Sequence, residues 1–179
     1  MRIGVIKETA AGENRVALTP ETAKKFTSLG YDVVVQSGAG VASSCPDAQY
    51  TAAGATVAPS AADALKDADL VLKVIAPTAD EAGLMKSGAI VLAAFAPHAN
   101  DNLDTYAAKG LTCVAMELIP RITRAQSSDI LSSQANVAGY KAVLLAANEY
   151  QRPFPMFMTS AGTVKPARVV IMGVGVAGL

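Results

Sequence analysis

The sequence predicts an α/β protein built on a Rossmann-like, doubly wound parallel sheet. Short β-branched or apolar runs alternate along the chain with alanine-rich helical stretches, an alternation typical of strand–helix–strand units with parallel strands. The run Ile90–Ala94 is apolar at every position, which suits a strand that is covered on both faces. We therefore expect one sheet with helices on both sides.

Seven runs have the length and composition of strands. Each is rich in apolar or β-branched residues, and a helical or turn-rich stretch separates it from the next. In chain order, the predicted strands are Arg2–Ile6, Asp32–Val35, Ala55–Ala58, Leu70–Ile75, Ala89–Phe95, Leu111–Ala115 and Val169–Met172. The last run lies far along the chain from the other six, so we expect it to begin a second sheet.

The predicted helices have recognisable start and stop residues. Thr19 followed by Pro20 suits an N-cap with proline at the first helical position, and Gly30 suits the end of that helix. Another helix is expected over residues 101–109. The longest covers residues 128–150, because apolar residues recur close to one face and no proline interrupts them.

These elements divide the chain into four parts. We expect a first α/β domain at 1–127, an interdomain helix at 128–150, a proline- and glycine-containing linker at 151–166, and the start of a second Rossmann domain at 167–179. No helix follows the glycines at the end of the sequence. The second domain is therefore expected to be truncated here.

Composition and charge exclude several classes of protein. Hydrophobic residues make up 51% of the 179 residues, which is enough for a packed core, and 15 basic residues balance 15 acidic ones. The balance disfavours a nucleic-acid partner. The longest apolar stretch is too short to cross a bilayer, so we expect a cytoplasmic chain without direct membrane insertion.

The two cysteines, Cys45 and Cys113, lack the spacing of a disulfide framework or a metal site, and we expect them to be reduced.

A glycine motif follows the last predicted strand. Gly173, Gly175 and Gly178 have the G-x-G-x-x-G spacing of a dinucleotide fingerprint, in which the glycines allow a tight turn and close approach of a pyrophosphate. The helix and the acidic residue that complete such a site are absent from the sequence. A glycine-rich strand end without a ligand is the alternative interpretation.

Polar residues follow several predicted strands, at the sheet edge where open α/β sheets bind ligands. Glu8 follows the first strand and Glu117 the sixth, whereas Lys73 lies inside an apolar run and needs a carboxylate or an anionic ligand. A structural ion pair and a ligand role are equally compatible with Lys73. The single histidine, His98, has no positioned partner in the sequence, so we assign it no catalytic role.

The segment 120–133 is the part of the chain richest in hydrogen-bonding side chains. Arg121, Gln126 and Asp129 lead into the long predicted helix. They could contact a nucleotide, or they could cap the helix and pair with one another. Spacing alone does not separate these two interpretations.

Three segments carry a resemblance to a known family. Residues 3–8 (Ile-Gly-Val-Ile-Lys-Glu) and 13–21 (Glu-Asn-Arg-Val-Ala-Leu-Thr-Pro-Glu) resemble the alanine dehydrogenase and pyridine nucleotide transhydrogenase family. Residues 120–133 resemble its transhydrogenase branch. The resemblance covers the whole chain and is to the NAD(H)-binding alpha subunit, through its first domain and into the first strand of its second.

The resemblance implies an activity, cofactors and partners. The complete subunit would bind NAD(H), a partner component would bind NADP(H), and hydride would pass directly between the two nicotinamides, coupled in the full complex to proton translocation. It further implies a homodimer, attached to the inner membrane only through membrane-spanning partner subunits. The fragment itself is expected to be inactive.

Roles for individual residues follow from the same resemblance. Arg121 and Ser132 would orient the NAD nicotinamide, Asp129 would hold Arg121, and Gln126 would reach the partner nucleotide. The pyrophosphate turn would consist of Gly173, Gly175 and Gly178.

Two other functions remain open. Arg15 and Lys73 correspond to the residues that hold the substrate carboxylate or carbonyl in alanine dehydrogenase, which makes that enzyme the alternative. Its acid–base histidine, however, would align with Pro97 and not with His98. A stand-alone, non-catalytic binding module is the alternative from another class.

Overall fold

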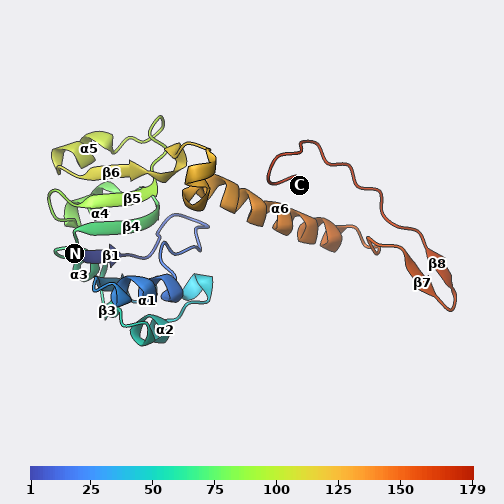
Figure 1. Ribbon diagram of the computed structural model, residues 1–179, viewed down its shortest axis with the longest axis horizontal. Helices are drawn as coiled ribbons and strands as arrows, with labels where there is room; N and C mark the ends of the chain where they lie inside the picture. Colours follow the sequence, from blue (N-terminus) through green and yellow to red (C-terminus); the bar gives the residue numbers. More distant parts are fainter. The chain divides into compact units, whose positions relative to one another are not determined.

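A six-stranded parallel sheet organises the N-terminal part of the chain in the computed structural model, which describes residues 1–179 throughout (Figure 1). The strand order is β3–β2–β1–β4–β5–β6. All five neighbouring pairs are parallel, so the predicted doubly wound sheet is confirmed. The strands are β1 (Arg2–Val5), β2 (Asp32–Gln36), β3 (Thr56–Ala58), β4 (Leu70–Ile75), β5 (Ile90–Ala94) and β6 (Thr112–Ala115).

Five helices connect these strands. They are α1 (Pro20–Ser28), α2 (Asp47–Ala52), α3 (Ala61–Leu65), α4 (Ala79–Leu84) and α5 (Leu103–Ala108), with a short 3-10 helix η1 at Val41–Ser43 and another, η2, at Met116–Leu118. Helix α1 begins as predicted, because the Thr19 side chain accepts a hydrogen bond from the Thr22 N–H at 3.3 Å. Gly30 follows its end with a φ of +83°, a conformation that glycine adopts without steric cost.

Alternate residues along the strands bury two cores on opposite faces of the sheet. One core contains Ile3, Val5, Val33 and Val35 packed with residues of α1 and α2. The other contains Val34, Val71 and Val91 packed with residues of α3, α4 and α5. The alternation is the two-residue period of a strand that contributes to both sides. Because all six strands are parallel, their carboxyl ends lie at one edge of the sheet.

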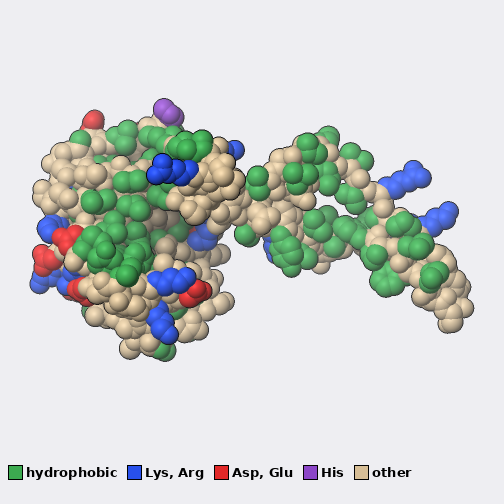
Figure 2. All heavy atoms as spheres, in the orientation of Figure 1, with side chains coloured by type: hydrophobic (Ala, Val, Ile, Leu, Met, Phe, Trp, Pro, Cys, Tyr) green, Lys and Arg blue, Asp and Glu red, His purple; other side chains and the backbone are tan.

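Helices do not cover both faces across the whole width of the sheet. Ile90 and Val114 lie on the same face of β5 and β6, and they are 40% and 38% exposed. Figure 2 shows hydrophobic side chains at the surface over β4–β6. We expected an apolar strand to be covered on both faces. This holds for β1 and β2 but not for β5. The apolar run of β5 identifies a strand, but it does not show whether a helix covers each face.

Gly4 of β1 allows close packing of α3 on the sheet, which gives a test of the fold. A Cβ atom at Gly4 would lie 2.7 Å from the Ala64 carbonyl oxygen. We expect Gly4→Ala to lower the free energy of unfolding by about 1–3 kcal/mol through overpacking. Gly83→Ala is the control, since a Cβ at Gly83 meets nothing within 4 Å, and alanine favours a helix over glycine by roughly 0.5–1 kcal/mol. Urea unfolding of both variants should give opposite signs, and equal effects would contradict this packing.

The chain divides into two compact units, unit 1 at 1–119 and unit 2 at 120–179. Unit 2 contains the 3-10 helix η3 (Thr123–Ser128), the helix α6 (Ile130–Glu149) and two short strands, β7 (Phe157–Thr159) and β8 (Gly162–Val164). Helix α6 matches the predicted long helix to within two residues at each end. Neither α6 nor any other helix is long and apolar enough to cross a membrane.

Two expectations about unit 2 need correction. The predicted linker contains the antiparallel hairpin β7–β8, in which residues 160–161 form the turn. Beside this turn the Thr159 hydroxyl donates a hydrogen bond to the Gly162 carbonyl at 3.1 Å. The predicted strand Val169–Met172 is not a strand. A strand exists only when a neighbouring strand accepts its backbone hydrogen bonds. Within residues 1–179 this segment has no such neighbour; its side chains are largely exposed, and it lines an apolar cavity whose other wall is α6.

Candidate functional site

Three ionised side chains form a buried cluster at the carboxyl ends of β1 and β4. The Lys73 ammonium donates to both oxygens of Glu81, at 3.0 and 2.9 Å, and lies 3.4 Å from Oε2 of Glu8. The side chains of Lys73 and Glu8 are only 2% exposed. Of the two interpretations of Lys73, the structure shows the ion pair.

Local structure fixes both carboxylates of this cluster. Glu8 follows β1, and its Oε1 accepts the Val74 N–H of β4 at 2.7 Å. Glu81 belongs to a capping box at the start of α4, in which Oε2 accepts the Thr78 N–H at 2.9 Å and the Thr78 hydroxyl accepts the Glu81 N–H at 3.2 Å. The T-x-x-E spacing of residues 78–81 signals such a box, and this signal would have identified Glu81 from the sequence.

The cluster carries two negative charges and one positive charge. Because both Glu81 oxygens and a Glu8 oxygen surround the Lys73 ammonium, an anionic ligand would have to displace a carboxylate to reach it. A buried charge needs such pairing to avoid a large desolvation cost. The cluster therefore joins β1, β4 and α4 at the edge of the sheet.

Arg15 lies in the loop after β1 and forms an ion pair with Glu13. The guanidinium donates to the Glu13 carboxylate at 2.8 and 2.6 Å. Hydrogen bonding to Glu13 raises the pKa of Arg15, and the charge of Glu8 adds to this effect. The same contact lowers the pKa of Glu13. Arg15 is thus a charged, half-exposed side chain within electrostatic range of Glu8.

Asp129 and Ser132 come together at the start of α6. Asp129 is the N-cap, and its two oxygens accept the Ser132 N–H at 2.9 Å and the Ser132 hydroxyl at 2.6 Å. These hydrogen bonds lower the pKa of Asp129, and the charge of Arg121 contributes to the shift. Arg121 and Gln126 have exposed side chains. The Arg121 guanidinium and the Gln126 amide are therefore accessible to a ligand, whereas hydrogen bonds hold the Asp129 carboxylate and the Ser132 hydroxyl together.

The three glycines of the fingerprint form a closed turn. Gly173 has a φ of +112°, and a Cβ on Gly178 would collide with the Gly173 carbonyl oxygen, so both positions require glycine. A Cβ on Gly175 would meet nothing within 4 Å. An open, side-chain-free backbone at the middle glycine fits the approach of a pyrophosphate.

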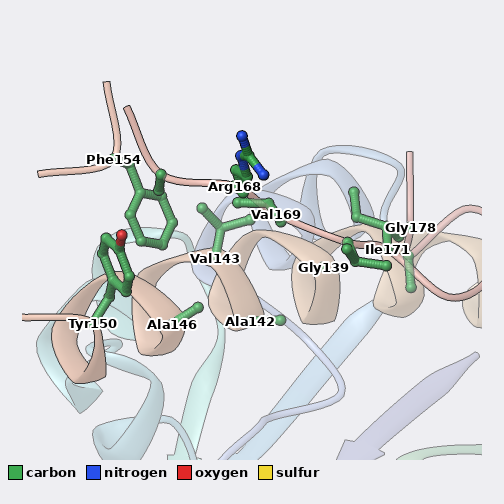
Figure 3. A pocket seen from close by; sticks show the side chains of 13 residues that line it. Gly139, Ala142, Val143, Ala146, Tyr150, Phe154, Arg168, Val169, Ile171 and Gly178 are labelled. Atoms are coloured by element: carbon green, nitrogen blue, oxygen red, sulfur yellow. The ribbon is translucent and has the colours of Figure 1, made fainter. Parts of the chain in front are cut away.

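An apolar cavity of about 450 Å³ lies between α6 and the segment that leads into this turn (Figure 3). Figure 3 shows Tyr150 and Phe154 at one end of it, with ring centroids 5.6 Å apart, and Gly139 and Gly178 at the other. A Cβ on Gly139 would collide with the Ala177 carbonyl oxygen. The lining is apolar apart from Arg168.

The fold defines the class of protein. A parallel sheet in the order 3-2-1-4-5-6, a polar carboxyl edge and a glycine-rich turn are those of Rossmann-like α/β proteins. The family "Alanine dehydrogenase/PNT, N-terminal domain" matches residues 4–138, and "Alanine dehydrogenase/PNT, C-terminal domain" matches residues 142–179. The chain belongs to this alanine dehydrogenase/PNT family of oxidoreductases, as its resemblance predicted.

Individual relatives extend over the whole chain. An NAD(P) transhydrogenase alpha subunit of Rhodospirillum rubrum is 51% identical over 100% of this chain and 48% of its own length. Alanine dehydrogenase of Mycobacterium tuberculosis (strain H37Rv) is 36% identical over 99% of this chain and 48% of its own. The crystal structure of transhydrogenase from Sinorhizobium meliloti matches with a TM-score of 0.93 and 52% identity, over 99% of this chain and 53% of that one. The chain thus spans about half the length of these relatives.

Proposed function

We propose that the protein acts as the NAD(H)-binding component of an NAD(P) transhydrogenase. The observation that carries this proposal is the identity of 51% to a transhydrogenase alpha subunit across the whole chain, against 36% to an alanine dehydrogenase over nearly the same residues. The division of the chain into a first α/β domain (1–127), an interdomain helix (128–150), a linker (151–166) and the start of an NAD-binding domain (167–179) is part of the proposal.

In this proposal the protein positions nucleotides and takes no part in the chemical step. The nicotinamides exchange a hydride directly, one as NAD(H) and the other as NADP(H) on a partner component. The glycine turn at Gly173, Gly175 and Gly178 would accept the pyrophosphate. Arg121 and Ser132 would orient the nicotinamide while Asp129 restrains Arg121, and such alignment lowers the barrier by holding reacting atoms at near-attack distance.

The proposed partners follow from the proposed activity. An NADP(H)-binding component and membrane-spanning components would complete the complex, with proton translocation in the membrane part. We further propose a homodimer that reaches the membrane only through these partners.

Two assays of the complete subunit separate the two activities of the family. With the NADP(H)-binding partner present, reduction of an NADP⁺ analogue by NADH supports transhydrogenation. Turnover of pyruvate, ammonia and NADH without the partner supports alanine dehydrogenase instead. Arg15 and Lys73 match residues that hold the substrate in alanine dehydrogenase and so favour that activity. Lys73, however, is already paired with Glu81 and Glu8. If the subunit binds NADH tightly but oxidises it in neither assay, the result supports a non-catalytic binding module.

Gln126 gives a residue-level prediction. Its side chain is exposed, and we propose that it reaches the partner nucleotide. We expect Gln126→Asn in the complete subunit to slow hydride transfer about tenfold while the dissociation constant of NADH stays nearly unchanged, since a contact that serves alignment affects the transition state more than binding. Single-turnover kinetics and an NADH titration separate the two quantities. A loss of NADH affinity with normal transfer would place Gln126 in a different role.

A further inference from the structure

Glu117 is a partly buried residue, and only one oxygen of its carboxylate has a hydrogen-bond partner. It lies in η2, directly after β6, and its Oε1 accepts the Ala96 N–H at 2.5 Å. Its second oxygen, Oε2, is buried and has no hydrogen-bond partner. A buried carboxylate oxygen without a donor is costly, so its retention calls for an explanation.

The turn held by Glu117 is itself strained. Ala96 has a φ of +46°, a conformation that side chains other than glycine adopt at a cost of roughly 1–2 kcal/mol. The Ala99 N–H donates to the Ala96 carbonyl at 2.8 Å, and the Asn100 side chain donates to the Phe95 carbonyl at 2.7 Å. Strained backbone that its surroundings hold in place is characteristic of ligand-binding segments.

The position of Ala96 and Glu117 in the fold is a third observation. Ala96 follows β5 and Glu117 follows β6, so both lie at the carboxyl edge of the parallel sheet. Ligands of open α/β sheets bind outside that edge. An oxygen that only accepts hydrogen bonds, on a partly exposed side chain at this edge, suits a neutral donor such as a hydroxyl or an amide.

We propose that Glu117 is a binding residue for the pyridine nucleotide: one carboxylate oxygen holds the turn 96–99, and the other accepts a hydrogen bond from a hydroxyl or amide group of the nucleotide. This inference rests on the proposed function. It assigns Glu117 two separable tasks, because only Oε1 is used in the structure of the protein alone.

Glu117→Gln separates these tasks. The amide oxygen of glutamine can still accept the Ala96 N–H, but its amino group cannot accept a hydrogen bond from a ligand. Removing the charge of a partly buried carboxylate that has no ion-pair partner also relieves part of a desolvation cost. In the complete subunit without nucleotide we therefore expect an unchanged or higher melting temperature. With NADH we expect the dissociation constant to rise about tenfold or more, as for loss of a hydrogen bond to a charged group.

Two comparisons complete the experiment. Glu117→Ala loses both tasks, so it should lower the melting temperature as well as NADH affinity. The reduced 3-acetylpyridine analogue of NADH lacks the carboxamide N–H. If the amide is the donor, Glu117→Gln weakens NADH binding but not binding of the analogue, and if a ribose hydroxyl is the donor, it weakens both.

The inference fails if Glu117→Gln binds NADH as the unaltered subunit does, or if its weaker binding comes with a lower melting temperature. Neither result affects the proposed function, which depends on hydride transfer by the unaltered subunit. Absence of transfer by the unaltered subunit would overturn the proposed function on its own.

Discussion

Replacing Lys73 by methionine is expected to lower the free energy of unfolding by about 3–5 kcal/mol, because removing one partner of a buried ion pair has an effect of this size. The change leaves the carboxylates of Glu8 and Glu81 buried without the ammonium that pairs with them. Methionine preserves most of the volume, so a cavity contributes little. Urea unfolding followed by far-ultraviolet circular dichroism measures the loss.

A matched control and a rescue make this prediction specific. Lys86→Met breaks the ion pair between Lys86 and Asp69, whose side chains are 48% and 42% exposed, and exposed pairs contribute little. Adding Glu81→Gln to Lys73→Met should recover part of the loss, because glutamine removes one buried charge and can still serve in the capping box. Equal effects of Lys73→Met and Lys86→Met would show that the buried cluster does not contribute to stability through pairing.

The second large effect is expected at Asp129. Asparagine is as good an N-cap as aspartate, so Asp129→Asn keeps an oxygen for the Ser132 N–H at the start of α6. It removes the negative charge that acts on Arg121. Under the proposed function, Arg121 then loses its restraint, and we expect hydride transfer in the complete subunit to slow about tenfold or more. Stopped-flow single-turnover kinetics with the partner component measures the rate.

Two further variants separate charge from capping at Asp129. Asp129→Ala removes the cap as well, so it should also lower the melting temperature. Asp104→Asn changes an exposed carboxylate in the first turn of α5 and should leave transfer unchanged. Normal transfer by Asp129→Asn would mean that the charge of Asp129 does not act through Arg121 in the reaction.

The six strands of unit 1 and its helices α1 and α5 are predictable because each carries a local signal. The apolar runs of β1 to β6, the Thr19–Pro20 start of α1 and, in unit 2, the uninterrupted helix α6 were identified from spacing and caps. The hairpin β7–β8 was missed, since its two three-residue strands are shorter than the window in which alternation is recognisable. The T-x-x-E box at 78–81 is a further local signal, and it indicates that Glu81 lies at the start of a helix.

The sequence by itself determined the fold class, the family and the residue types at the carboxyl edge, because hydrophobic period, glycine spacing and motif identity are properties of the chain alone. Only the tertiary structure decided that Lys73 is paired with Glu81 and Glu8, and that Glu117 has one oxygen occupied and one without a partner. Such pairings join residues from different strands and helices. Their free energy depends on distance and burial, which folding sets and local sequence does not contain.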